Sequence, residues 1–210
     1  MKVKVCGMKY EDNIRSVSLL KPDYMGFIFY GRSKRDFKGT IPSINKEIKK
    51  VGVFVNEELE TIKDRVERFG LDAIQLHGDE SANDCDTILR ELPGLELIKA
   101  FSMSESFDFN RLEAYLKSCD YFLFDTKGKE RGGNGTLFDW SILEDYPFEK
   151  PFFLSGGIGL EEIPLLRDFL KSDAATFCKV IDVNSKFEIE PGLKKVEELE
   201  RFIEFIEKEK

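Results

Sequence analysis

Two side chains that can exchange protons follow apolar runs in this sequence: Cys6 after "KVKV" and Asp125 after "YFLF". A cysteine acts as a base through its thiolate, and a carboxyl group that is removed from water has a raised pKa, which suits a general acid near neutral pH. Each residue also has a structural explanation, because free cysteine packs well in a core and Asp125 could cap a loop or pair with Lys127 or Arg131. The residues alone leave both explanations open.

A basic loop and the single histidine of the chain could also take part in chemistry. In "GRSKRDF", Arg32 and Lys34 are interpreted as parts of a solvated loop. Arg35 is not distinguished from them by its residue type, although a guanidinium at this place could bind a substrate carboxylate through two hydrogen bonds. His77 could pair with Cys6 as a nucleophile couple, so a cysteine hydrolase is an alternative. No orienting aspartate or asparagine is identifiable for it, and a structural or substrate-positioning role is the interpretation.

Glycines follow an apolar run in "FFLSGGIGL", where Gly156 and Gly157 would let the backbone approach a ligand closely. A helix expected from about Leu160 would add amide groups that can bind an anion. In "VIDVNSKFE", Asn184 and Ser185 can supply further donors. The pattern predicts a phosphate site, with a tight connection that binds nothing as the alternative.

The composition limits the partners and the compartment. The net charge is −8 and the pI is about 5.0, so no general affinity for nucleic acid or for an anionic membrane is expected, whereas a small basic pocket is compatible with it. The four cysteines are widely spaced, without a CxxC pair, which argues against zinc, redox-dithiol and secreted disulfide sites. With no signal peptide and no apolar run of membrane-span length, a cytoplasmic protein without a metal is expected.

Short runs rich in β-branched and aromatic residues recur about every 20 to 30 residues and predict strands, with about eight helical segments between them. In "NEELETIKDRVERFG", Asn56 is the expected N-cap and Gly70 the stop signal. Two further helices are predicted in "DESANDCDTILRELPG" and "SFDFNRLEAYLK". The predicted strands are 2–6, 24–29, 51–55, 72–76, 95–100, 121–125, 151–155 and 178–182. The last helix carries an apolar stripe that is expected to face the rest of the fold: Val196, Leu199, Phe202, Ile203 and Ile206.

Strands that alternate with helices predict a parallel sheet, and eight units of roughly 26 residues predict a compact (β/α)8 barrel, with residues 1–210 as a single domain. An open flavodoxin-like sheet would need fewer strands. The active face of such a barrel lies at the carboxyl ends of its strands, which is where Cys6, His77 and Asp125 are placed. The segment 127–135, "KGKERGGNG", is predicted to be a loop that covers a pocket.

Together these motifs closely resemble the phosphoribosylanthranilate isomerase family, barrel enzymes of tryptophan biosynthesis. No block is decisive alone, but the blocks occur in the family's order from residue 3 to about 205, and their combination is very specific. They are "KVCGMK", "DYMGFIFYGRSKR", "VGVFVN", "IQLHGDE", "FDTKGKERGGNGTLFDW", "FLSGGI" and "VIDVNSKFEIEPGLK". The resemblance implies an Amadori rearrangement without a cofactor, from N-(5'-phosphoribosyl)anthranilate to 1-(2-carboxyphenylamino)-1-deoxyribulose 5-phosphate, the third step from chorismate.

The resemblance also implies a role for each candidate residue. Asp125 would protonate the furanose ring oxygen as general acid. Cys6 would remove a proton from the adjacent sugar carbon as general base, provided that its pKa is low enough for a thiolate at neutral pH. Arg35 would bind the anthranilate carboxylate. The other implied roles are Asp182 near the anthranilate ring or amine, His77 in the pocket lining, and Gly156, Gly157 and Ser185 at the phosphate.

The binding loops depart from the family's pattern at three positions. Lys34 stands where a proline is usual, Lys186 replaces a glycine of the phosphate loop, and Thr136 replaces a lysine. None of these three residues is the implied general acid or general base, so the departures affect substrate binding more than the reaction itself. The alternatives are another phosphosugar-binding barrel isomerase or synthase, and a barrel that binds a phosphate ligand without catalysis. A monomer or a homodimer is expected.

Overall fold

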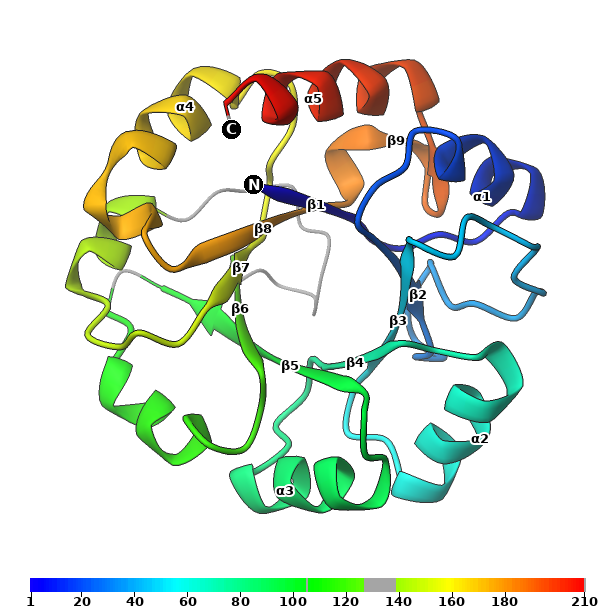
Figure 1. Cartoon of the computed structure of the whole chain (residues 1–210), viewed down its shortest axis with the longest axis horizontal. Coiled ribbons are helices and arrows are strands. Elements are labelled where there is room, and N and C mark those ends of the chain that lie inside the picture. The colour runs from blue at the N-terminus through cyan, green and yellow to red at the C-terminus, as the bar shows by residue number, and fades with distance from the viewer. Residues whose placement is uncertain (105, 127–138, 210) are drawn as a thin grey trace.

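The computed structural model describes residues 1–104, 106–126 and 139–209 of the chain. Eight parallel strands form a closed barrel in the order of the sequence, with helices around it (Figure 1). The predicted (β/α)8 fold is therefore confirmed. The strands are β1 (Lys2–Val5), β2 (Tyr24–Ile28), β3 (Lys49–Phe54), β4 (Ala73–Leu76), β5 (Glu96–Met103), β6 (Tyr121–Thr126), β7 (Phe152–Leu154) and β8 (Cys178–Val183).

Each predicted strand overlaps an observed one, and the largest difference is in β5, which continues to Met103. The barrel closes between β8 and β1, where Lys4 is the register partner of Asp182. A two-stranded antiparallel hairpin of β9 (Glu188–Glu190) and β10 (Leu193–Lys194) follows β8 and was not predicted. This hairpin becomes important at the site.

The helical predictions are only partly correct. In the described ranges there are five α-helices, fewer than the expected eight segments, and short 3-10 helices replace others; the segment 107–116 contains a 3-10 helix over Phe109–Tyr115. The segment 29–48, between β2 and β3, has turns and no helix, which agrees with its Gly, Pro and Ser content. The α-helices are α1 (Glu11–Ser18), α2 (Leu59–Phe69), α3 (Ala82–Glu91), α4 (Ile163–Lys171) and α5 (Val196–Lys208).

Asn56 does not cap a helix, and this prediction is wrong. The N-cap of α2 is Glu58, while Asn56 adopts a left-handed conformation with φ 50°. Its side-chain oxygen accepts a hydrogen bond from the amide of Asp79 at 2.6 Å, and its own amide donates to Glu80 at 2.7 Å. Asn56 therefore ties the loop after β3 to the loop after β4. Gly70 does end α2, in the left-handed conformation that favours glycine.

The strands are buried on both faces, unlike the half-buried strand that the alternation in "KVKV" suggests. One apolar cluster lies between strands and helices and contains Val3 and Val5. A second cluster fills the barrel interior, as expected where helices cover a parallel sheet. Lys4, between the two valines, is 0% exposed and points to the interior side. The interior cluster consists of Tyr24, Val51, Ala73, Ile98, Ala100, Leu123, Phe153 and Val180.

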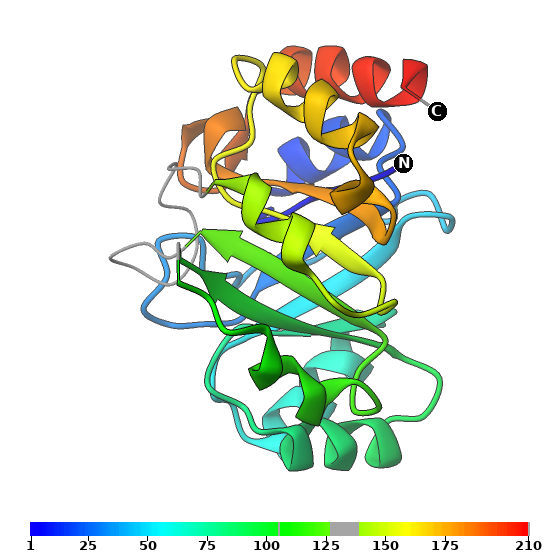
Figure 2. The same ribbon diagram turned by 90° about the vertical axis from the view of Figure 1, so that its left-hand side faces the viewer.

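In the ring of helices around the barrel, α4 and α5 lie on one side, α2 and α3 lie on the opposite side, and α1 lies between α5 and α2 (Figures 1 and 2). The predicted stripe of α5 faces the rest of the fold: Leu199, Phe202, Ile203 and Ile206 are buried, Val196 packs against the core while partly buried, and Phe205 joins them. In the described part of the chain, no helix is long and apolar enough to cross a membrane.

Candidate functional site

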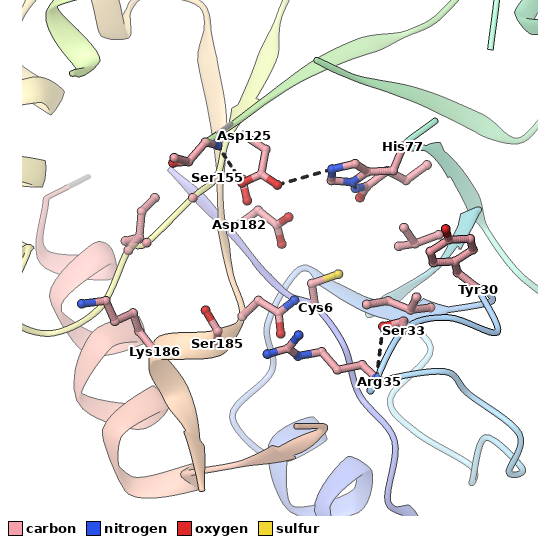
Figure 3. A pocket seen from close by; sticks show the side chains of 18 of the residues that line it. Cys6, Tyr30, Ser33, Arg35, His77, Asp125, Ser155, Asp182, Ser185 and Lys186 are labelled. Carbon is pink, nitrogen blue, oxygen red and sulfur yellow. Dashed lines mark hydrogen bonds and ion pairs between the residues drawn. The ribbon is translucent and has the colours of Figure 1, made fainter. Parts of the chain in front are cut away.

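A pocket at the carboxyl ends of the strands collects the candidate residues (Figure 3). They come from strand ends and from loops that are distant in sequence, and the barrel brings them to one face. The predicted residues that line this pocket are Cys6, Arg35, His77, Asp125, Gly156, Gly157, Asp182 and Ser185. The predicted loop at 127–135 lies outside the described residues.

Cys6 is held at the rim of the barrel just beyond β1. Its amide donates to the carbonyl of Val183 on β8 at 2.9 Å, and its side chain is almost fully buried. Glycines make room around it: a side chain on Gly26 would place its Cβ 2.7 Å from the Cys6 sulfur. Gly7 adopts φ +75°, and a Cβ there would lie 2.8 Å from Arg35 Cδ. The thiol of Cys6 is thus fixed at the rim, and the missing side chain of Gly7 lets Arg35 approach closely.

Asp125, the residue before the last in β6, lies on the same face and is 6% exposed. One carboxylate oxygen accepts the amide of Thr126 at 2.9 Å, and the other lies 3.4 Å from His77 Nε2. Figure 3 shows Asp125, Asp182 and Cys6 in succession across the pocket, with the His77 ring opposite Asp125. The expected burial of Asp125 is therefore observed.

His77 contacts Asp125 and Gln75, which disfavours the couple with Cys6 considered above. Gln75 Nε2 lies 2.9 Å from His77 Nδ1, and Gln75 Oε1 accepts a hydrogen bond from Lys4 at 2.7 Å. Because the amide oxygen is occupied by the lysine, the amide NH2 donates to Nδ1. The proton of a neutral His77 is then on Nε2, which faces Asp125.

Asp182 on β8 lies at the centre of the pocket floor and is 5% exposed. Its Oδ2 accepts a hydrogen bond from Lys4 Nζ at 2.9 Å. Its Oδ1 is buried and has no hydrogen-bond partner among the described residues. A buried acceptor without a partner is costly, so this oxygen is available to a donor group on a ligand.

Arg35 lines the pocket but is already paired. Its Nε and Nη2 donate to both carboxylate oxygens of Glu188, with a shortest distance of 2.6 Å. Glu188 also accepts from Lys194 at 2.8 Å. Although burial opposes it, Arg35 and Lys194 hold the pKa of Glu188 below its ordinary value. Burial lowers the pKa of Lys194 to about 8, and Glu188 partly opposes this change.

The end of the pocket opposite His77 is formed by the loops after β7 and β8. Gly156 and Gly157 have φ of 95° and 68°, which lets their backbone turn into the pocket without a side chain. Ser185 and Lys186 approach from the β8 loop, and Lys186 Nζ lies 3.4 Å from Glu162. The helix after the glycines begins at Ile163, later than expected, with a proline in its first turn.

Cys6 does not meet the condition set for a thiolate at neutral pH. Burial raises the pKa of the Cys6 thiol, and Asp182 raises it further, whereas Lys4 and Lys194 lower it. In the ligand-free pocket Cys6 is therefore mainly a thiol. Two positive charges nonetheless act against its protonation, and both come from residues that the sequence analysis did not identify.

The residues that sequence reasoning missed are Lys4, Gln75, Glu188 and Lys194. A signal was present for Lys4, because it lies two residues before Cys6 on an alternating strand and must therefore share its face. Gln75 on β4 and His77, the residue after the end of β4, are related in the same way. Glu188 and Lys194 lie inside the block "FEIEPGLK", but nothing local indicates that they reach Arg35.

Comparison with known proteins places this site in a family. A model of the N-(5'-phosphoribosyl)anthranilate (PRA) isomerase family matches residues 3–205. The N-(5'-phosphoribosyl)anthranilate isomerase of Parabacteroides distasonis is 45% identical over 213 residues, covering 98% of this chain and 93% of the relative.

Solved structures agree with this match. The phosphoribosyl anthranilate isomerase of Thermotoga maritima has a TM-score of 0.81 and 32% identity, with 99% of both chains covered. A phosphoribosyl anthranilate isomerase in complex with reduced 1-(o-carboxyphenylamino)-1-deoxyribulose 5-phosphate has a TM-score of 0.79 and 29% identity, again over 99% of both chains. With a family model that spans nearly all of its length and a relative at this level of identity, the chain belongs to the N-(5'-phosphoribosyl)anthranilate isomerase family.

Proposed function

We propose that this pocket isomerises N-(5'-phosphoribosyl)anthranilate to 1-(2-carboxyphenylamino)-1-deoxyribulose 5-phosphate, with Asp125 as general acid and Cys6 as general base. The observation that carries the assignment is that a buried carboxyl and a buried thiol line one pocket, at the carboxyl ends of β6 and β1. Family membership supplies the substrate, and the two groups supply the proton transfers that the reaction needs.

The reaction requires a proton to be delivered and another to be removed. Asp125 protonates the furanose ring oxygen, the bond from that oxygen to the anomeric carbon breaks, and the nitrogen lone pair forms an iminium. The iminium acidifies the neighbouring C–H, and the Cys6 thiolate takes that proton. The electron pair left on carbon forms an enolamine, which becomes the ketone by tautomerisation. His77 Nε2, 3.4 Å from the Asp125 carboxylate, orients this carboxyl group in the pocket.

Two groups of residues bind the phosphate and the anthranilate part of the substrate. Gly156, Gly157 and Ser185 hold the phosphate, and the Arg35 guanidinium, which lies beside Cys6 in Figure 3, binds the anthranilate carboxylate. Asp182 accepts the anthranilate N–H through Oδ1, the buried oxygen without a partner. Asp182 is thus a binding residue in this proposal.

No metal or organic cofactor is part of the proposed reaction, because the iminium itself makes the C–H acidic. Among the residues that the structure describes, no cluster of His, Cys, Asp and Glu suits a metal ion. We further propose a cytoplasmic enzyme, since its four cysteines are free thiols, as in a reducing compartment. The Thermotoga maritima relative is a dimeric protein; for this chain a monomer or a homodimer stays a prediction that sedimentation analysis would decide.

The test is the fluorescence decay of freshly prepared N-(5'-phosphoribosyl)anthranilate with the wild type, Cys6→Ser and Asp125→Asn. Each substitution is expected to lower kcat by at least about a hundredfold, the usual range for loss of a general acid or base. Cys85→Ala is the matched control, because Cys85 is buried in α3 away from the pocket and should leave turnover near the wild-type rate. Turnover should also persist with a chelator.

The outcomes of this test distinguish the proposed function from the proposed roles of Cys6 and Asp125. Absence of wild-type turnover would overturn the function. Full activity of Cys6→Ser or of Asp125→Asn would overturn the role of that residue and leave the function intact.

A further inference from the structure

The Cys6 thiol is the base of the proposed function, and something must stabilise its charge. A buried lysine lies directly beside it. Lys4 is two residues earlier, in β1, and Cys6 continues the pairing with β8 one residue beyond the end of that strand, so the strand alternation places both side chains toward the barrel interior. It is 0% exposed and lies beneath the pocket, while Cys6, Gln75 and Asp182 around it line the pocket itself.

The hydrogen bonds of Lys4 leave one donor unassigned. An ammonium group has three N–H donors. One goes to Gln75 Oε1 at 2.7 Å and one to Asp182 Oδ2 at 2.9 Å. The described part of the chain offers Cys6 as the further group with which this ammonium interacts. The third donor has no carboxylate or amide partner among the described residues, and the Cys6 thiol is the group left for it on the interior face.

Lys4 keeps its positive charge despite its burial. Removal from water opposes the charge, but Asp182 and Cys6 outweigh that effect and raise the pKa of Lys4. A permanent ammonium in a dry site acts strongly on its neighbours, because the low local dielectric screens it little. Asp182 and a Cys6 thiolate are the two negative charges that can share it.

The other cations near Cys6 are already paired with carboxylates, so they are less available to stabilise a Cys6 thiolate. Lys194 on β10 and Arg35 in the loop after β2 both pair with Glu188, and Lys194 also donates to the Asn184 side chain. On the opposite wall, His77 faces the Asp125 carboxylate. Asp182 on β8 is the remaining charged group that acts on the thiol, and it is negative.

We propose that Lys4 is a positioning residue that supplies the counter-charge of the Cys6 thiolate and shares this charge with Asp182 in the ligand-free pocket. The proposal rests on the proposed role of Cys6 as base. It predicts that substitutions of Lys4 and of Asp182 change the thiolate fraction of Cys6 in opposite directions. Loss of Lys4 removes the cation from the sulfur, whereas neutralisation of Asp182 releases the whole ammonium charge to it.

The test measures the rate of iodoacetamide alkylation of Cys6 against pH in the ligand-free protein, with peptide mapping by mass spectrometry. Only the thiolate reacts, so the profile reports its fraction. Burial raises the pKa of Cys85, Cys119 and Cys178 to about 12, and mapping separates their peptides from that of Cys6. No substrate is needed, so the result is independent of the proposed function.

Lys4→Met is expected to move the profile to higher pH by about one unit or more, which lowers the rate at pH 7.5 by about tenfold. Asp182→Asn is expected to move it to lower pH and to speed alkylation. Lys99→Met is the matched control: Lys99 is likewise a buried strand lysine paired with a carboxylate, that of Glu80 at 3.1 Å. It should leave the profile of Cys6 unchanged.

If Lys4 and Asp182 only maintained the structure, their substitutions would not shift the alkylation profile of Cys6 in opposite directions. Shifts of the same sign in Lys4→Met and Asp182→Asn, or an equal shift in Lys99→Met, would overturn the proposal. If Lys4→Met does not fold, Asp182→Asn decides alone, since it retains the lysine, and unchanged or slower alkylation contradicts the shared charge. Absent turnover with the expected shifts would overturn the function and leave the counter-charge in place.

Discussion

At the scale of single residues, Arg35 differs most from what its position in the sequence suggests. In "GRSKRDF" it is one of several basic residues, but in the structure it is 13% exposed in its side chain and bound to Glu188 through two nitrogens. A planar guanidinium held in this way presents its remaining edge in a fixed direction. Such orientation reduces the entropy that carboxylate binding would cost.

The first prediction concerns this orientation. Arg35→Lys keeps a positive charge but loses the two-pronged contact, so the KM for N-(5'-phosphoribosyl)anthranilate should rise by about tenfold to a hundredfold, as expected from a charged hydrogen bond of about 1.5–3 kcal/mol. Steady-state kinetics with kcat and KM determined separately measure this. Arg32→Lys, on an exposed neighbour, is the control and should change neither constant. An unchanged KM in Arg35→Lys would show that this guanidinium does not bind the substrate.

At the scale of elements, the β9–β10 hairpin is what completes the site. It carries Glu188 and Lys194 back over the loop after β2, where they meet Arg35. Lys194 Nζ also donates to the carbonyl and side-chain oxygens of Asn184 at 3.2 and 2.7 Å. The hairpin thereby links the loop that carries Arg35 to the loop proposed to bind phosphate.

The second prediction concerns the acid stability of this hairpin. The pKa of Glu188 is below its ordinary value of 4.5 in the folded protein, against the effect of burial, because of Arg35 and Lys194. A lowered folded-state pKa contributes stability above the unfolded-state pKa and loses it as the pH falls through the folded value. Glu188→Gln should therefore be less stable than the wild type above about pH 5, and the difference should shrink below pH 4.5.

Urea unfolding at a series of pH values measures this difference. Glu190→Gln, an exposed change in the same hairpin, serves as control and should show a smaller difference across the range. A stability difference between the wild type and Glu188→Gln that does not vary between pH 3 and pH 7 would contradict the role of the ionised Glu188.

At the scale of the whole molecule, two apolar clusters keep the pocket in shape. The outer cluster joins the strands to the helices, and the inner one fills the barrel below the pocket. The C-terminal helix α5 packs on β1 and α1 at the point where the barrel closes. Because β1 also carries Lys4 and leads into Cys6, the packing of this last helix supports the end of the first strand that the proposed function places in the site.

The third prediction tests this closure. Phe202 in α5 is fully buried and packs on Phe187 with ring centroids 5.2 Å apart. Phe202→Ala should lower the free energy of unfolding by about 3–5 kcal/mol, through lost burial and a residual cavity. Guanidinium unfolding followed by circular dichroism measures it. Glu204→Ala, on the exposed face of the same helix, should stay within about 0.5 kcal/mol of the wild type. A loss below about 1 kcal/mol in Phe202→Ala would show that α5 contributes little to closure.

The fold and the composition of the site could be predicted because they rest on local patterns. An apolar run such as "YFLFD" predicts a strand by its residue types, and a residue at the end of a parallel strand lies on the same face as the other strand ends. Cys6, Asp125 and the Gly156-Gly157 pair could be placed in this way. Asn56 could not, since its left-handed backbone is stabilised by the amides and carboxylate of another loop.

By itself, the sequence determined the (β/α)8 barrel and which strand ends carry reactive groups, because periodicity and residue type act over a few neighbouring positions. Only the tertiary structure decided which groups touch. Lys4 meets Gln75 across 71 positions, and Arg35 meets Glu188 across 153. Contacts over such separations depend on barrel closure and on the register between strands. The protonation of Cys6 belongs to this second class, since burial and the charge of Lys4 oppose each other only after the barrel has formed.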